Sequence, residues 1–136
     1  MERMIDDSGM RAPASRRILV LAHMGRPEAR VAAQQTLRQL ADSGVEGVLT
    51  AEDRDAMLRA PEVDELPPVG VVPDNCALSD IELVVVLGGD GSILRAAEVV
   101  RDVEVPLLGV NLGHVGFLAE SERSGLAETV QAVVDG

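Results

Sequence analysis

The sequence predicts an α/β protein with a mainly parallel sheet flanked by helices, and three observations lead to this fold class. Short, continuously apolar segments recur along the chain, which is typical of strands buried on both faces of a parallel sheet. Segments with helix-start and helix-stop residues lie between them, so strand and helix alternate. Glycine-rich turns follow two of the expected strands, at 88–91 and 109–116. Because ligands bind beyond the carboxyl ends of parallel strands, both turns are expected at a ligand-binding edge.

The first half of the chain is expected to hold two strands and one clear helix. Residues 17–22 (RILVLA) and 45–50 (VEGVLT) read as strands because they are apolar and β-branched without a helical period. Between them, a helix is predicted from Pro27 to Gly44, since proline suits the first helical turn and glycine suits the stop. Residues 51–80 contain four of the seven prolines and many acidic residues. They are predicted to be a solvated, irregular connection with a helical turn or two at its start.

The second half is expected to repeat the strand–helix pattern twice. Residues 83–89 (LVVVLGG) and 105–110 (VPLLGV) are predicted as buried strands. A helix over 92–103 follows the first of them. A last helix is predicted over 124–136, with Ser124 as its N-cap, because serine is a favoured capping residue.

Length, composition and charge exclude several classes of protein. The first 15 residues mix both charge signs and lack an apolar h-region, so they read as a disordered leader before one α/β domain at 16–136. No apolar run is long enough to predict a membrane span. The single cysteine, Cys76, fits a reducing cytoplasm. A net charge of −11 and a single aromatic residue, Phe117, argue against binding nucleic acid or an anionic membrane.

The turn Gly88-Gly89-Asp90-Gly91 carries the clearest chemical signal. Three glycines at a strand-to-helix turn leave backbone N–H groups open to a ligand, and the following helix adds its positive end, which favours phosphate. The chain has no lysine, so this is no Walker loop, and the third glycine of a dinucleotide fingerprint is absent. An aspartate in a phosphate cradle suits proton transfer from an attacking hydroxyl, or help in holding Mg²⁺. The simpler alternative is an ordinary turn with a capping aspartate.

Two stretches taken together, LGGDGSILRAA and PLLGVNLGHVGFLAE, resemble the NAD kinase family (ATP/polyphosphate-NAD kinases), in its actinobacterial form. Gly-Gly-Asp-Gly alone is shared with diacylglycerol kinases and 6-phosphofructokinases. The second stretch, running from Gly109 to Leu118, is similar to NAD kinases and not to those relatives. The resemblance implies a Rossmann-like N-terminal domain of this wider kinase group. Ser92 stands where the family usually has threonine, which keeps the hydroxyl.

The resemblance implies transfer of the γ-phosphoryl group of ATP to the 2′-hydroxyl of the adenosine ribose of NAD, with a divalent cation, Mg²⁺, and NADP as product. Asp90 would accept or orient the proton of that hydroxyl. No residue is expected to be a metal ligand in its own right. The residues implied to bind substrate lie in and after the two glycine-rich turns: Gly88, Gly89, Asp90, Gly91, Ser92, Arg95, Asn111, Gly113, His114 and Phe117.

Several of these positions have simpler alternatives. Arg95 could be a surface arginine, Phe117 could be a core residue, and Asn111 could merely end a strand. His114 could belong to a polar loop. The family's β-rich second domain has no counterpart in this chain, so the chain alone is expected to have little or no kinase activity, and the full-length protein is expected to be a homo-oligomer. The alternatives to NAD kinase are a lipid or sugar kinase of the same group and a non-catalytic nucleotide-binding remnant.

Overall fold

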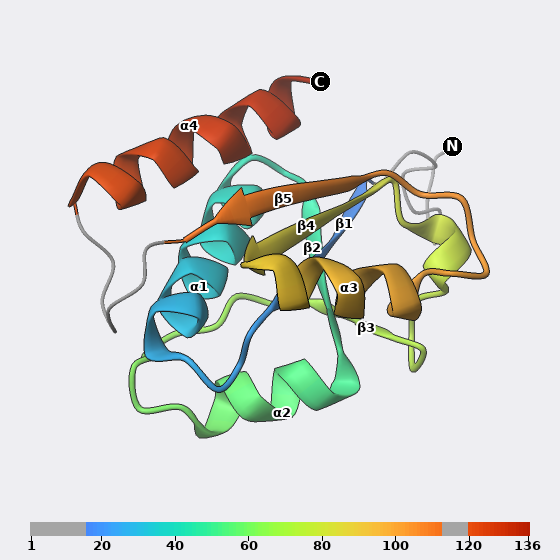
Figure 1. Cartoon of the computed structure of the whole chain (residues 1–136), viewed down its shortest axis with the longest axis horizontal. Helices are drawn as coiled ribbons and strands as arrows, with labels where there is room; N and C mark the ends of the chain where they lie inside the picture. The colour runs from blue at the N-terminus through green and yellow to red at the C-terminus, as the bar shows by residue number, and fades with distance from the viewer. Residues whose placement is uncertain (1–15, 113–119) are drawn as a thin grey trace, which may run out of the picture.

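The computed structural model describes residues 16–112 and 120–136, which form one sheet with helices on both faces (Figure 1). The sheet has the strand order β3-β2-β1-β4-β5, and every neighbouring pair is parallel. Its strands are β1 (Arg17–Ala22), β2 (Glu46–Thr50), β3 (Gly70–Val72), β4 (Leu83–Gly88) and β5 (Leu107–Asn111). The predicted fold class is therefore confirmed, and β1 lies at the centre of the sheet.

Helices connect the strands in the order that a parallel sheet requires. They are α1 (Pro27–Asp42), α2 (Ala51–Arg59), α3 (Asp90–Val99) and α4 (Glu120–Asp135), with a 3-10 turn, η1, at Leu78–Asp80. Helices α1 and α4 pack against each other, whereas α3 packs against β4 and β5 (Figure 1). Within the described ranges, no helix has the length and apolarity that a bilayer span requires.

The central strand shows why its segment is continuously apolar after Arg17. Ile18 and Val20 of β1 belong to the core cluster shared with α1 and α4, while Leu19 and Leu21 belong to the cluster on the α3 face. All four side chains are at most 1% exposed. Both faces of β1 are therefore covered, which removes the alternation of apolar and polar residues that a half-exposed strand would show.

The segment predicted as an irregular connection contains two regular elements. Helix α2 runs for nine residues, and β3 pairs with β2 at the edge of the sheet. β3 has only three residues and lies between prolines at 68 and 73, so its sequence carries a turn signal rather than a strand signal. The helical turns predicted at the start of this segment are confirmed as α2, whereas β3 was not predicted.

Two boundaries and the burial of one strand in the second half also differ from the prediction. β5 is an edge strand whose residues are half-buried or exposed, not a buried strand, because β4 is its only partner in the described sheet. Helix α3 begins at Asp90, before the predicted start. Helix α4 begins at Glu120, so Ser124 lies inside the helix and is not its N-cap. The predicted leader, residues 1–15, lies outside the described residues.

Candidate functional site

The Gly-Gly-Asp-Gly turn joins β4 to α3 with a single residue between them. Gly88 ends the strand with φ +154°, a conformation that L side chains rarely adopt. A Cβ there would run into the hydroxyl oxygen of Ser92, so glycine is required both by the backbone and by the packing. Gly89 is the N-cap of α3, and its carbonyl accepts hydrogen bonds from the backbone N–H groups of Ser92 (3.1 Å) and Ile93 (3.2 Å).

This tight junction places Asp90 as the first residue of α3. The structure describes Asp90 by its backbone alone. Because the N-cap is a glycine, it brings no side chain to the first N–H groups of the helix. The start of α3 therefore combines an open backbone with the positive end of the helix dipole, which favours an anionic ligand beside it.

The second glycine-rich stretch meets the first at the end of the sheet. Gly88 is in register with Asn111, and the backbone N–H of Leu112 donates to the carbonyl of Gly88 at 3.3 Å. A cavity of about 190 Å³ lies between the two, lined by Val86, Gly88, Gly89, Ile93, Gly109, Val110 and Asn111. The structure therefore brings Gly88, Gly89 and Asn111 together, as the sequence predicted.

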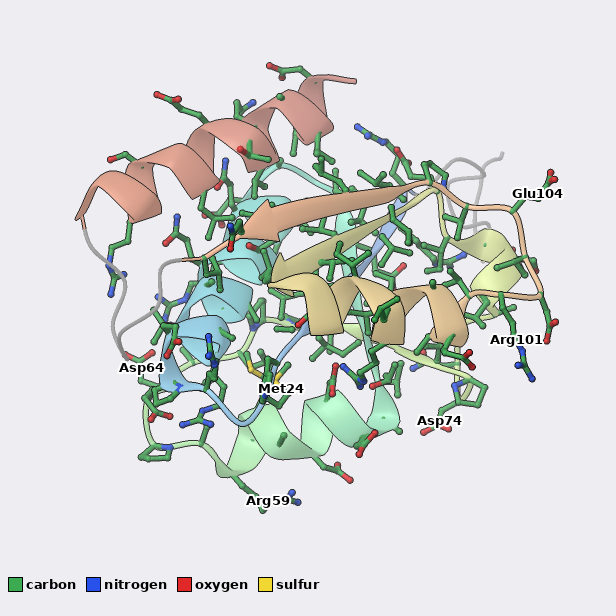
Figure 2. The ribbon with its side chains drawn as sticks, in the orientation of Figure 1. Met24, Arg59, Asp64, Asp74, Arg101 and Glu104 are labelled. Atoms are coloured by element: carbon green, nitrogen blue, oxygen red, sulfur yellow. The ribbon has the colours of Figure 1, made fainter. Side chains whose placement is uncertain are left out.

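A larger cavity, of about 530 Å³, lies on the other side of the same turn. Three segments form its wall: the end of β1 and its loop, helix α2, and the first turns of α3. Figure 2 shows the side chain of Met24, from the β1 loop, lying beside α2. The lining residues are Ala22, His23, Met24, Gly25, Glu52, Asp53, Ala56, Arg59, Gly91, Ser92 and Arg95. Gly91, Ser92 and Arg95 therefore share a cavity that Gly88 and Gly89 do not line.

Arg95 is the cation of this cavity with the most contacts. Its Nη2 donates to Oδ1 of Asp53 at 3.1 Å and lies 3.9 Å from Oε1 of Glu52. Its Nη1 donates to the carbonyl of Ala22 at 3.4 Å. Arg95 thus connects α3 to α2 and to the end of β1. It is not an isolated surface arginine, although its side chain remains 39% exposed.

Asp53 is the residue of this site that the sequence analysis missed. Its side chain is 3% exposed, and its Oδ2 is buried with no hydrogen-bond partner among the described residues. Burial raises the pKa of Asp53, and the nearby charge of Arg95 opposes that rise without cancelling it. A sequence signal did exist: Thr50-x-x-Asp53 has the spacing of a capping box, and the hydroxyl of Thr50 accepts from the backbone N–H of Asp53 at 3.1 Å.

The remaining predicted site residues, Gly113, His114 and Phe117, lie outside the described residues. His23, at the end of β1, lines the large cavity, and its Nδ1 accepts from the backbone N–H of Gly25 at 3.2 Å. Over 16–112 and 120–136, no group of three or more histidine, cysteine or acidic side chains is placed to hold a metal ion. Glu52 and Asp53 alone do not fit a metal centre built by the protein, so no metal ligand is assigned.

Fold and site together define a parallel α/β domain with a phosphate-favouring, glycine-rich turn at its ligand edge. The sequence model described as the ATP-NAD kinase N-terminal domain matches residues 18–136, and the chain belongs to this family. The match covers both glycine-rich stretches and everything between β1 and α4.

Curated relatives agree with this assignment. The chain is 52% identical over 119 residues to an NAD kinase of Leifsonia xyli, covering 86% of this chain and 38% of the relative. It is 47% identical over 122 residues to an NAD kinase of Thermobifida fusca, covering 89% of this chain and 37% of the relative. Both relatives come from actinobacteria. The chain therefore spans a little over a third of the length of the curated relatives it matches.

A solved structure supports the fold. Yeast NADH kinase, in a crystal structure with NADH, superimposes with a TM-score of 0.67 at 20% identity, covering 90% of this chain and 37% of that one. At this identity the likeness concerns the fold alone, and it again involves about a third of the longer protein.

Proposed function

We propose that this chain is the N-terminal part of an NAD kinase, which transfers the γ-phosphoryl group of ATP to the 2′-hydroxyl of the adenosine ribose of NAD. Family membership and the curated relatives support the reaction class. The observation that carries the proposal is the junction between β4 and α3. There, a glycine that tolerates no side chain fixes Asp90 at the open N-terminus of a helix.

In this proposal Asp90 is the general base. Its carboxylate accepts the proton of the 2′-hydroxyl while the hydroxyl oxygen forms a bond to the γ-phosphorus of ATP. The bond from that phosphorus to the β,γ-bridging oxygen breaks, ADP leaves, and NADP is formed. Backbone N–H groups at the start of α3 face the phosphates. In the proposal, Gly113, His114 and Phe117 of the second glycine-rich stretch bind substrate as well.

The charge balance supports a role for magnesium that comes with the substrate. The chain has a net charge of −11, and the large cavity combines Arg59 and Arg95 with Glu52 and Asp53. These residues leave little net positive charge for a triphosphate. ATP would therefore enter as its magnesium complex, in which the metal offsets part of the negative charge of the phosphates. The proposal places the whole protein in the cytoplasm as a homo-oligomer.

The test is a chimera, because this chain spans little over a third of its relatives. Residues 18–136 replace the matching segment of the Leifsonia xyli NAD kinase, and NADP formation is measured with ATP and Mg²⁺. We expect turnover, and we expect Asp90→Asn to lower kcat by roughly 10²–10⁴-fold with a modest effect on nucleotide binding, since this is the usual contribution of a general base.

Asp102→Asn is the matched control, because Asp102 is exposed in the turn after α3. It should leave kcat unchanged. A chimera that folds, as judged by circular dichroism against the parent relative, yet forms no NADP would contradict the proposal. So would an Asp90→Asn chimera with the kcat of the control.

A further inference from the structure

The wall of the large cavity contains a carboxylate that a phosphate site would be expected to avoid. Asp53 is 3% exposed at its side chain, and it lines the same cavity as Gly91, Ser92 and Arg95. A buried negative charge repels a bound nucleotide, and it also costs desolvation. Its presence there needs a compensating benefit.

The contacts of Arg95 indicate what that benefit is. An arginine side chain has several rotatable bonds, so an unrestrained guanidinium near a ligand loses conformational freedom on binding. Here three elements restrain it: Asp53 on α2, Ala22 at the end of β1, and its own helix α3. The guanidinium has five N–H donors, and only two are used by hydrogen bonds within the described residues. The others are available to a ligand in the cavity.

A purely structural tie between α2 and α3 explains these contacts less well. Arginine–carboxylate pairs are frequently bidentate. Arg30 and Glu62 form such a pair in this chain, at 3.0 and 2.8 Å. Asp53 instead uses one oxygen, and its Oδ2 stays buried with no partner in the part of the chain that the structure describes. The pair therefore orients Arg95 without occupying the whole guanidinium.

We infer that Asp53 is a positioning residue, whose buried carboxylate holds the guanidinium of Arg95 at the cavity wall so that its free N–H donors meet a phosphate group of a nucleotide substrate. The inference rests on the proposed function for the identity of the ligand. It adds a residue outside both glycine-rich motifs to the site. Asp53 acts through Arg95 and makes no contact with the substrate.

The first test concerns the guanidinium itself and needs no ligand. In ¹⁵N-labelled chain, NMR measures rotation of the arginine guanidinium groups. Arg101 is the internal reference for a mobile side chain: it is 70% exposed, pairs only with Glu98 among the described residues, and lies at the far end of α3 (Figure 2). We expect restricted rotation at Arg95, and release of that restriction in Asp53→Asn. An Arg95 as mobile as Arg101 in the parent chain would overturn the inference.

The second test uses the chimera with the Leifsonia xyli NAD kinase as the parent protein. It measures binding of NAD, and separately of ATP with Mg²⁺, to this parent and to its Asp53→Asn, Arg95→Met and double variants. Positioning predicts that Asp53→Asn weakens binding about tenfold for the nucleotide whose phosphate meets Arg95, because misplaced contacts lose their interaction energy. On the Arg95→Met background the same substitution should have no further effect, because Asp53 acts only through that arginine.

Glu52→Gln is the charge-matched comparison. Glu52 lies 3.9 Å from the same Nη2, but its side chain is 88% exposed. Its removal makes the cavity equally less negative without freeing Arg95, so binding should be at least as tight as in the parent. If Asp53→Asn behaves like Glu52→Gln, or still weakens binding without Arg95, the inference is wrong. If the folded parent chimera binds neither nucleotide, the proposed function fails, and the NMR measurement alone decides whether Asp53 holds Arg95.

Discussion

Arg16 and Arg95 lie at opposite ends of the same sheet, and their pairing with a carboxylate differs. Arg16 bonds both oxygens of its partner, whereas Arg95 bonds one. Arg16 precedes β1 and pairs with Glu82, which precedes β4, through two hydrogen bonds of 2.9 and 2.8 Å. It also donates to the last turn of α4, at the carbonyls of Val134 (2.7 Å) and Val133 (3.0 Å). At the carboxyl end, Arg95 has one bond of 3.1 Å to a carboxylate and one of 3.4 Å to a carbonyl.

The difference separates a contact that holds the fold from one that prepares a site. At the amino end, both oxygens of Glu82 are used, and Arg16 joins three elements of the chain. At the carboxyl end, one oxygen of Asp53 is buried and has no partner within residues 16–112 and 120–136. Proteins commonly leave such local deficits at functional sites and offset them elsewhere. The Arg16–Glu82 pair, in which both carboxylate oxygens are bonded, therefore lies far from the large cavity. The Arg95–Asp53 pair, in which one oxygen is bonded, lies in the wall of that cavity.

The largest effect on stability should come from removing the arginine of the Arg95–Asp53 pair. Arg95→Met leaves a buried carboxylate without its cation, and we expect a loss of about 3 kcal/mol in the free energy of unfolding. Asp53→Asn leaves a guanidinium that is 39% exposed and can be hydrated, so its cost should be less than about 1 kcal/mol. Urea unfolding of the two variants at neutral pH measures the asymmetry.

The double variant Asp53→Asn/Arg95→Met is the control for this asymmetry. Because it removes both charges, it should recover most of the stability that Arg95→Met loses. Equal losses in the two single variants would mean that the pair is a symmetric structural tie, and the contrast with the amino end would then disappear.

The next effect concerns the backbone at the carboxyl end. Gly88→Ala should lower the free energy of unfolding by roughly 1–3 kcal/mol, the usual cost of an unfavourable backbone conformation. Its new methyl group would also push Ser92 away. Gly89→Ala is the matched control, since its φ is −126° and a Cβ there meets nothing within 4 Å. If thermal melts of the two variants coincide, the junction is not held by Gly88.

Sequence reasoning predicted the parts of this fold whose signal is local. Strand β4, and strand β1 after Arg17, are apolar because both faces are buried. Helix α1 starts at a proline and is followed by Gly44 with φ +79°. The Gly-Gly-Asp-Gly turn was predicted from its glycines alone, because they permit positive φ and leave the backbone open. The structure adds that Ser92 occupies the space that a side chain at Gly88 would need.

The missed features depend on contacts between distant segments. β3 has three residues, and only its pairing with β2 makes it a strand. Asp53 lies in a segment of acidic residues that reads as solvated, and its burial follows from the placement of α2 beside Arg95 of α3. A capping-box spacing predicts the start of α2 but not that its third residue faces a cavity. The roles assigned to Asp90 and the other site residues remain predictions.

The smallest effect, and the one that compares the two ends most directly, is the pH dependence of Asp53 and Glu82. The Arg16 guanidinium lowers the pKa of Glu82 from its ordinary 4.5, whereas burial raises the pKa of Asp53 from its ordinary 3.8. A lowered pKa means that Glu82 stabilises the fold above pH 4.5, and that this contribution is lost as the pH falls through the folded-state value. A raised pKa means that ionised Asp53 costs stability, and that the cost grows as the pH rises above 3.8.

Unfolding free energies of the parent, Glu82→Gln and Asp53→Asn, measured from about pH 3 to pH 7, test the direction of both pH dependences. As the pH falls, the parent should lose its advantage over Glu82→Gln and gain relative to Asp53→Asn. If both differences move in the same direction, Arg95 compensates Asp53 as fully as Arg16 compensates Glu82, and the carboxyl end of the sheet carries no deficit for a ligand to relieve.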